Sequence, residues 1–171
     1  MSKKILVTYA SRTGWTVGVA EAIAKTLEEN EAQVDVVRML DVKDLSSYQA
    51  VVVGSTINGA AWMPEAMQFI REHHEELKCK PFATFQVCMT LAMRNGETYR
   101  PHVMTWMEPV RKLVKPIREG FFAGGLDIGR IPSFADRLKF RISVLFGVWK
   151  EGNHRDWNAI RAWTLDILKV L

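Results

Sequence analysis

Cysteine is scarce in this chain, which has only Cys79 and Cys88 among its 171 residues. Secreted domains that depend on disulfides use more cysteines, arranged in a regular framework. The sequence therefore predicts a protein of a reducing compartment, and we expect it in the cytoplasm.

Long hydrophobic runs are absent as well. No apolar run reaches the roughly 18 residues that a membrane-spanning helix needs, so none is expected. Lys3 and Lys4 precede an apolar run, but that run covers only residues 5–10 before Ser11 and Arg12 follow. It is too short for the core of a signal peptide.

The chain lacks internal repeats, low-complexity segments and linker-like stretches. Its 48% apolar and 25% charged residues make an ordinary globular composition. A chain of this length can bury a real core without disulfides or metals. We expect residues 1–171 to form a single domain.

An excess of acidic residues is also missing, because 23 basic and 19 acidic residues leave a net charge of +4. The excess lies within residues 128–155, and the remainder of the chain carries no net charge. A nucleic-acid-binding protein would spread its basic side chains over a wider surface. We therefore expect no nucleic-acid partner.

Apolar, β-branched runs alternate with amphipathic segments along the chain. Strands are expected at residues 4–9, 33–38, 50–55, 81–90 and 120–126, and helices at 16–30, from 64 onward, at 101–114 and at 155–171. Several strands are apolar throughout, which is typical of a parallel sheet covered on both faces. The sequence predicts an α/β, doubly wound fold with a five-stranded parallel sheet, in which ligands bind at the carboxyl ends of the strands.

The loop after the first strand carries three hydroxyls and a glycine at a predicted helix start. They are Ser11, Thr13, Gly14 and Thr16. Helix N-termini attract anions, and a glycine lets the backbone approach the anion closely. The G-x-G-x-x-G and G-x-x-x-x-G-K-[ST] patterns are missing, so the loop predicts a site for a terminal monophosphate. The alternative is a helix capped by Ser11 or Thr13 without a ligand.

Residues 11–16, which read Ser11-x-Thr13-Gly14-x-Thr16, resemble the flavodoxin phosphate loop, [ST]-x-T-G-x-T. Further segments are similar to the branch of flavodoxin-domain proteins that includes the menaquinone-dependent protoporphyrinogen oxidases; they are Gly54-Ser55-x-Ile57, Trp62-x-Pro64-Glu65-Ala66, Phe121-Phe122-Ala123-Gly124, Asp136-Arg137 and Asp156-Trp157-x-x-Ile160. The resemblance implies a flavodoxin-like sheet with strand order 2-1-3-4-5 and an insert after strand five. It also implies the cofactor FMN, with its phosphate on residues 11–16 (Ser11, Arg12, Thr13, Gly14, Trp15 and Thr16).

The same resemblance places the flavin ring between the loops that follow strands three and four. The expected contacts are Thr56, Ile57, Asn58, Gly59 and Trp62 in the first loop, and Cys88, Met89, Thr90, Leu91 and Ala92 in the second. Trp62 could stack on the ring or, equally, pack into the core at a helix start. Cys88 fits a small buried hydrophobe better than a redox group.

Arg12 lies inside the phosphate loop, and the chain lacks the acidic character of small electron-carrying flavodoxins. A positive charge about 8 Å from the ring is worth about 2 kcal/mol at an effective dielectric constant near 20. That energy corresponds to roughly 90 mV on a one-electron couple. We expect Arg12 to stabilise negative charge on the flavin, unless it simply pairs with the phosphate.

The basic segment is predicted to contain a helix over residues 131–150. We expect one face, formed by Phe134, Leu138, Ile142, Leu145, Phe146 and Trp149, to pack on the domain. A second ridge of Phe140, Val144 and Val148, flanked by Arg137 and Arg141, would then be left for an anionic membrane surface, a partner or a carboxylated or quinone-type substrate. The alternatives are burial in a homo-oligomer interface or a cover for the sheet edge.

No metal site is expected, because His73, His74 and His154 have no acidic or cysteine partners at ligand spacing. The function that the resemblance implies is an FMN-dependent oxidoreductase of the protoporphyrinogen oxidase type, in which the flavin and no protein side chain carries the chemistry. The alternatives are a soluble electron carrier and a flavin-binding module without turnover. The basic insert favours the enzyme, and deletion of residues 131–150 is expected to abolish partner reaction but leave FMN bound.

Overall fold

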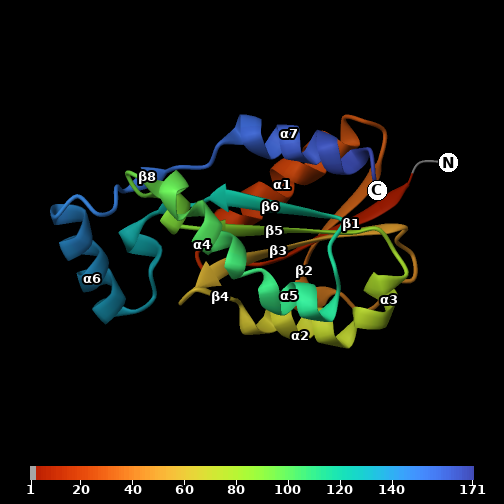
Figure 1. Cartoon of the computed structure of the whole chain (residues 1–171), viewed down its shortest axis with the longest axis horizontal. Coiled ribbons are helices and arrows are strands. Elements are labelled where there is room, and N and C mark those ends of the chain that lie inside the picture. The colour runs from red at the N-terminus through yellow and green to blue at the C-terminus, as the bar shows by residue number, and fades with distance from the viewer. Residues whose placement is uncertain (1–2) are drawn as a thin grey trace.

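A computed structural model describes residues 3–171, and its centre is a parallel β-sheet (Figure 1). The strands lie in the order β2-β1-β3-β5-β6. Their bounds are Lys4–Ala10 for β1, Gln33–Arg38 for β2, Ala50–Asn58 for β3, Phe82–Cys88 for β5 and Arg118–Ala123 for β6. All four pairings are parallel, so the predicted flavodoxin-like order of five strands is confirmed.

The strands form where expected because their residues are β-branched or aromatic and are buried from both sides. In β1, Ile5, Leu6 and Val7 are all 0% exposed, and they alternate between the two faces of the sheet. Ile5 and Val7 belong to one buried cluster, whereas Leu6 belongs to another. A continuous apolar run is therefore the expected sequence of such a strand.

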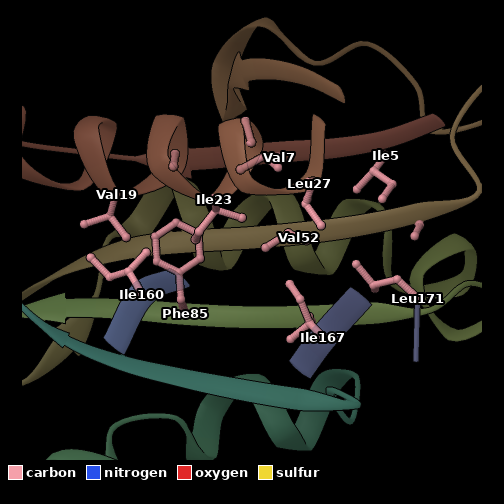
Figure 2. Packing of buried hydrophobic residues seen from close by; sticks show 14 of the residues in the cluster. Ile5, Val7, Val19, Ile23, Leu27, Val52, Phe85, Ile160, Ile167 and Leu171 are labelled. Atoms are coloured by element: carbon pink, nitrogen blue, oxygen red, sulfur yellow. The ribbon is translucent and has the colours of Figure 1, made fainter. Parts of the chain in front are cut away.

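Helices α1 (Trp15–Glu28) and α7 (Trp157–Leu168) cover one face of the sheet. Figure 2 shows their contribution to the first cluster, in which Val19, Ile23 and Leu27 of α1 meet Ile160 and Ile167 of α7 above Phe85 and Val52. The spacing of three and four residues puts these side chains on one side of each helix. This packing fixes the start of α1 at the carboxyl end of β1.

Shorter helices cover the other face. They are α2 (Pro64–Glu72), α3 (His74–Lys78), α4 (Arg100–Thr105) and α5 (Glu108–Leu113). The helix predicted over 101–114 is divided in two, because Pro109 cannot donate a backbone hydrogen bond and stands at the start of α5 instead. Phe69, Ile70 and Val110 pack there against Leu6, Val51 and Val53 of the sheet.

The insert leaves the domain after β6 and returns before α7. Its base is a two-stranded antiparallel ribbon of β7 (Gly125–Leu126) and β8 (Gly152–Asn153), and its helix, α6, covers Phe134–Leu145. The strand predicted over 120–126 is thus interrupted at Gly124, whose N–H donates to the carbonyl oxygen of Cys88 at 3.2 Å. In Figure 1 the insert lies at the end of the molecule toward which the parallel strands point.

The prediction of which face of α6 packs is wrong. Phe140, Val144 and Trp149 pack against a small cluster of Leu126, Ile128 and Ile131. Of the face that was expected to pack, Trp149 does so, but its other members are exposed, with Phe134 79% and Leu145 85% accessible. Val148 of the second ridge is exposed as well. The Ser133 hydroxyl caps the helix, and Arg137 donates to the carbonyl oxygen of Ile131, so contacts with the ribbon set the rotation of the helix.

No helix within residues 3–171 is both long enough and apolar enough to cross a membrane.

Candidate functional site

The loop between β1 and α1 has the geometry of an anion site. Gly14, just before the helix, has a φ of 87°, a left-handed conformation that glycine adopts without strain. The Ser11 hydroxyl accepts a hydrogen bond from the Gly14 N–H at 3.1 Å. No side chain caps α1, and its first turn has no acidic residue. The structure thus does not support the alternative of a side-chain cap, and the N–H groups of the first turn are available to an anion.

The loop after β3 is tied to this first loop by two contacts. The hydroxyls of Thr16 and Thr56 are 2.6 Å apart, and Arg12 donates to the Asn58 Oδ1 at 3.1 Å. Thr16 is completely buried, so its hydroxyl positions the loops. Gly59 and Ala60 turn the chain in left-handed conformations toward the short strand β4 (Ala61–Trp62), which pairs with β3.

Arg12 also faces the insert, because its guanidinium lies 3.7 Å from the Asp136 carboxylate on α6. Both side chains are about one-third exposed, so solvent screens the pair. The isolated positive charge expected from the sequence is therefore partly neutralised by a residue 124 positions away in the chain. This pair connects the phosphate-type loop to α6.

A cleft opens between the two loops, the loop after β5 and the insert. It is lined on one side by Arg12, Thr56 and Asn58 and on the other by Leu126 and Ile131 of the insert. Of the predicted residues, it brings together Arg12, Thr13, Trp15, Thr56, Ile57, Asn58, Met89 and Phe140. An adjoining hollow adds Thr16 and Cys88.

Other predicted residues lie outside the cleft. Thr90, Leu91 and Ala92 form a 3₁₀ turn after β5 and do not line either hollow. Arg141 is exposed on α6, and Val144 is half-buried against the ribbon.

Trp62 belongs to the core and cannot stack on a ligand in the cleft. Its side chain is 5% exposed, and its indole N–H donates to the Gln86 Oε1 at 2.9 Å. Of the two roles considered for Trp62, the structure supports packing at the start of α2. The reason is that Gln86 in the centre of the sheet needs a buried hydrogen-bond partner.

Cys88 is 4% exposed at the end of β5. Burial raises the pKa of its thiol, although the backbone N–H groups of Leu91 and Thr90 and the charge of Arg100 oppose that effect. A thiol with a raised pKa is a poor nucleophile at neutral pH. Its place beside the cleft therefore fits a packing role.

Three residues that the sequence reasoning missed, Gly125, Arg130 and Arg155, surround the predicted Trp15. The indole of Trp15 lies over the backbone of Gly125, where a Cβ atom would come within 2.5 Å of it. The guanidinium carbons of Arg130 and Arg155 lie 5.3 Å and 4.8 Å from the centre of the Trp15 ring. The Gly124-Gly125 pair after β6 was the only local signal, because it marks a close approach of another chain segment.

The two arginines add positive charge beside the start of α1. Arg155 donates to the carbonyl oxygen of Trp15 at 3.3 Å, and Arg130 forms an ion pair with Asp127 at 3.2 Å. Burial, and then the nearby charge of Arg130, lower the pKa of Arg155. Two cations held together near a helix N-terminus indicate a preference for an anionic ligand.

Within residues 3–171, no three His, Cys, Asp or Glu side chains gather in a way that could hold a metal ion.

Comparison with known proteins identifies the family of this chain and supports the fold described above. Residues 6–146 match the family model described as flavodoxin domain. The chain is 30% identical to a protein of Leishmania major named protoporphyrinogen IX dehydrogenase [quinone], over 96% of this chain and 74% of the relative. A protein of the same name from Escherichia coli K12 is 25% identical, over 96% of this chain and 94% of the relative. Among solved structures, a Fusobacterium nucleatum flavodoxin bound to flavin mononucleotide has a TM-score of 0.54 at 14% identity, with 99% of each chain covered.

Proposed function

This chain belongs to the flavodoxin-domain family, and from that premise we propose that it is an FMN-binding oxidoreductase that transfers electrons between the flavin and a quinone or another small-molecule partner. The observation that carries the proposal is the Ser11–Gly14 loop at the start of α1, whose Arg12 and Thr13 line the cleft. The relatives named protoporphyrinogen IX dehydrogenase [quinone] support the choice of partner class.

The residues of the loop fit a phosphate monoester. Ser11 and Thr13 supply hydroxyls, Gly14 has no side chain to obstruct the approach, and the first turn of α1 supplies uncapped N–H groups. The guanidinium of Arg130 reaches this loop, since its Nη1 lies 3.6 Å from the position that a Gly14 Cβ would occupy. These groups would hold and orient the phosphate end of FMN.

The residues of the cleft fit a flat, largely apolar ring with one polar edge. Ile57, Met89 and Leu126 provide apolar walls, and Thr56 and Asn58 provide hydrogen-bonding groups. Bound FMN would supply the redox chemistry, while the protein orients it and sets its electrostatic surroundings. We propose that Thr90, Leu91 and Ala92 contact the ring through their backbone groups, and that Gly59 belongs to the turn that shapes the cleft.

The partner is proposed to enter beside the insert. Phe140 lines the cleft, and Arg137 lies half-buried on the same helix, so this side combines an apolar wall with positive charge. A porphyrinogen carries several carboxylates and a quinone is apolar, and either would suit such an entrance. We propose a cytoplasmic protein whose insert meets its partner or a membrane surface.

A cofactor titration tests the proposal. FMN is added to purified protein, and binding is followed by the flavin absorbance and fluorescence. We expect stoichiometric binding, and we expect Ser11→Ala/Thr13→Ala to weaken FMN binding about tenfold or more, because each lost charge-assisted hydrogen bond costs about 1.5–3 kcal/mol. Ser47→Ala is the matched control, because Ser47 is exposed before the amino end of β3, and it should change nothing. The proposal is contradicted if no flavin stays bound to the protein after FMN is added and the excess is removed.

A second experiment separates an enzyme from an electron carrier. The FMN-loaded protein is reduced without oxygen and mixed with a menaquinone analogue. Rapid reoxidation supports the quinone-coupled enzyme. Absence of reaction, together with rapid reoxidation by a protein electron acceptor, would support a soluble carrier instead.

A further inference from the structure

Helix α6 exposes a row of large apolar side chains on the side that faces away from the domain. This outer face consists of Phe134, Leu138, Ile142, Leu145 and Phe146, which are 47% to 85% exposed. Their spacing of three and four residues places them on one side of the helix. Contiguous exposed apolar groups of this size mark an interaction surface.

The outer face is not a misplaced core face, because α6 already has one. Phe140 and Val144 lie on the opposite side of the helix and pack against Ile131 and its neighbours. The helix is therefore apolar on two sides, and only one of them is used within the chain. In Figure 1 it lies at the end of the molecule, away from the marked termini.

Basic side chains border the outer face on both sides. On a helical wheel of 100° per residue, Arg141 and Lys139 lie at its two edges, and both are exposed. Lys150 is exposed just after the helix. Of the acidic residues of the insert, Asp127 pairs with Arg130 and Glu151 accepts the N–H of Ile128 at 3.2 Å. Asp136 lies 3.7 Å from Arg12 and 4.0 Å from Lys139. The Lys139 side chain is nevertheless 79% exposed, so its ammonium group stays accessible.

We propose that the outer face of α6 docks on an anionic lipid bilayer, with its apolar side chains in the interface and Lys139 and Arg141 against the headgroups. This is the arrangement of helices that lie in the plane of a membrane surface. A second copy of the chain fits less well, because the basic borders of both copies would be brought together without acidic partners.

The proposed contact has a consequence that rests on the proposed function. Ile131, Pro132 and Phe140 of the same insert line the cleft from its inner side. A bilayer on the outer face of α6 would therefore lie close to the mouth of the cleft. A lipid-soluble quinone could then reach the site without crossing much water.

Vesicle binding of the full chain tests the inference. The protein is sedimented with vesicles of phosphatidylcholine, either alone or with about one third phosphatidylglycerol. We expect partitioning onto the anionic vesicles at least tenfold stronger than onto the neutral ones, and a marked loss when the ionic strength rises from about 0.05 M to about 0.5 M.

Two variants, each with a double substitution, separate the apolar and the charged contributions to membrane binding. Leu145→Gln/Phe146→Gln should lower partitioning at least tenfold. Lys139→Gln/Arg141→Gln should lower it about 25-fold on anionic vesicles only, since each basic residue contributes about fivefold. Val170→Gln is the matched control, because Val170 is an exposed apolar residue near the carboxyl terminus, at the other end of the molecule. Circular dichroism confirms that each variant is folded.

Equal binding to both kinds of vesicle, or binding that the variants do not change, would overturn the inference. A dimer in analytical ultracentrifugation that Leu145→Gln/Phe146→Gln dissociates would overturn it in favour of a second copy. The flavin absorbance of the same samples is recorded separately. Membrane binding without flavin binding would support the docking surface and contradict the proposed function. Flavin binding without membrane binding would support the proposed function and contradict the docking surface.

Discussion

The indole of Trp62 forms one end of a buried chain of polar groups. Its N–H donates to the Gln86 Oε1, and the Gln86 amide in turn donates to the carbonyl oxygen of Val103 at 2.8 Å. All the polar atoms of this chain are satisfied only if the indole points into the core. A tryptophan beside the proposed cofactor loops is therefore a structural residue here.

Replacement of Trp62 separates these two roles. We expect Trp62→Phe to lower the free energy of unfolding by about 1–3 kcal/mol, because the Gln86 Oε1 loses its partner, and to change the FMN dissociation constant less than about twofold. Urea denaturation and FMN titration measure the two quantities. Trp106→Phe, at a half-buried position, is the control for stability. A large loss of FMN affinity in Trp62→Phe would show that the indole contacts the ligand.

The Asp136 carboxylate lies 3.7 Å from the Arg12 guanidinium and partly neutralises its electrostatic effect on the cleft. Asp136→Asn should leave Arg12 free to stabilise negative charge on reduced FMN and so raise the midpoint potential by roughly tens of millivolts. Arg12→Gln should lower it. A spectroelectrochemical titration measures both, with Asp166→Asn, which removes an exposed ion pair with Arg118, as the control. Unchanged potentials in both variants would show that the pair does not act on the flavin.

At the scale of elements, α6 shows that amphipathicity does not determine which face packs. The helix has two apolar sides, and the ribbon of β7 and β8 holds the one that carries Phe140 and Val144. The same rotation brings Asp136 toward Arg12 and turns Phe134 and Leu145 outward. One side of α6 therefore contributes Phe140 to the lining of the cleft, and the other side is exposed to solvent.

Removal of the insert is therefore expected to affect more than the partner. Replacing residues 131–150 with a short glycine-serine linker removes Ile131, Asp136 and Phe140 from the cleft wall. We now expect this change to weaken FMN binding about tenfold or more, instead of leaving it intact as the sequence suggested. Leu145→Gln/Phe146→Gln, which changes only the outer face, should leave FMN affinity unchanged. Fluorescence titration compares the two, and equal affinities would show that the insert takes no part in the cofactor site.

At the scale of the whole molecule, the parallel arrangement of the sheet determines where the candidate site lies. The strands β1, β3, β5 and β6 are parallel, so their carboxyl ends meet at one edge, and the loops that follow them approach each other there. The two clusters on either side of the sheet hold the strands in register. A ligand that bridges these loops should stabilise the whole fold.

Ligand linkage makes this testable. FMN at about 100 times its dissociation constant should add about 2.7 kcal/mol of stability, which corresponds to a rise in Tm of roughly 5–10 °C for a chain of this size. Riboflavin, which lacks the phosphate, should raise Tm less at the same concentration. Differential scanning calorimetry measures the shift. Equal effects of the two ligands would argue against the Ser11–Gly14 loop as the phosphate site.

The sequence by itself determined the order of the elements, the parallel sheet and the hydroxyl-rich loop at the start of α1. These features depend on local patterns: apolar runs for buried strands, three-and-four spacing for helices, and hydroxyls with a glycine between a strand and a helix. The composition also located the excess positive charge in the insert, because that is a property of residues 128–155 alone.

Only the tertiary structure decided how side chains from distant segments meet. The burial of Trp62 on Gln86, the pairing of Arg12 with Asp136, the placement of Trp15 over Gly125 and the rotation of α6 each depend on a partner far away in the chain. Local propensity cannot specify such contacts, because packing and hydrogen-bond satisfaction are settled between elements after these have formed. The anionic-surface proposal for α6 could therefore be assigned to a particular face only once the fold had shown which side of the helix was already in use.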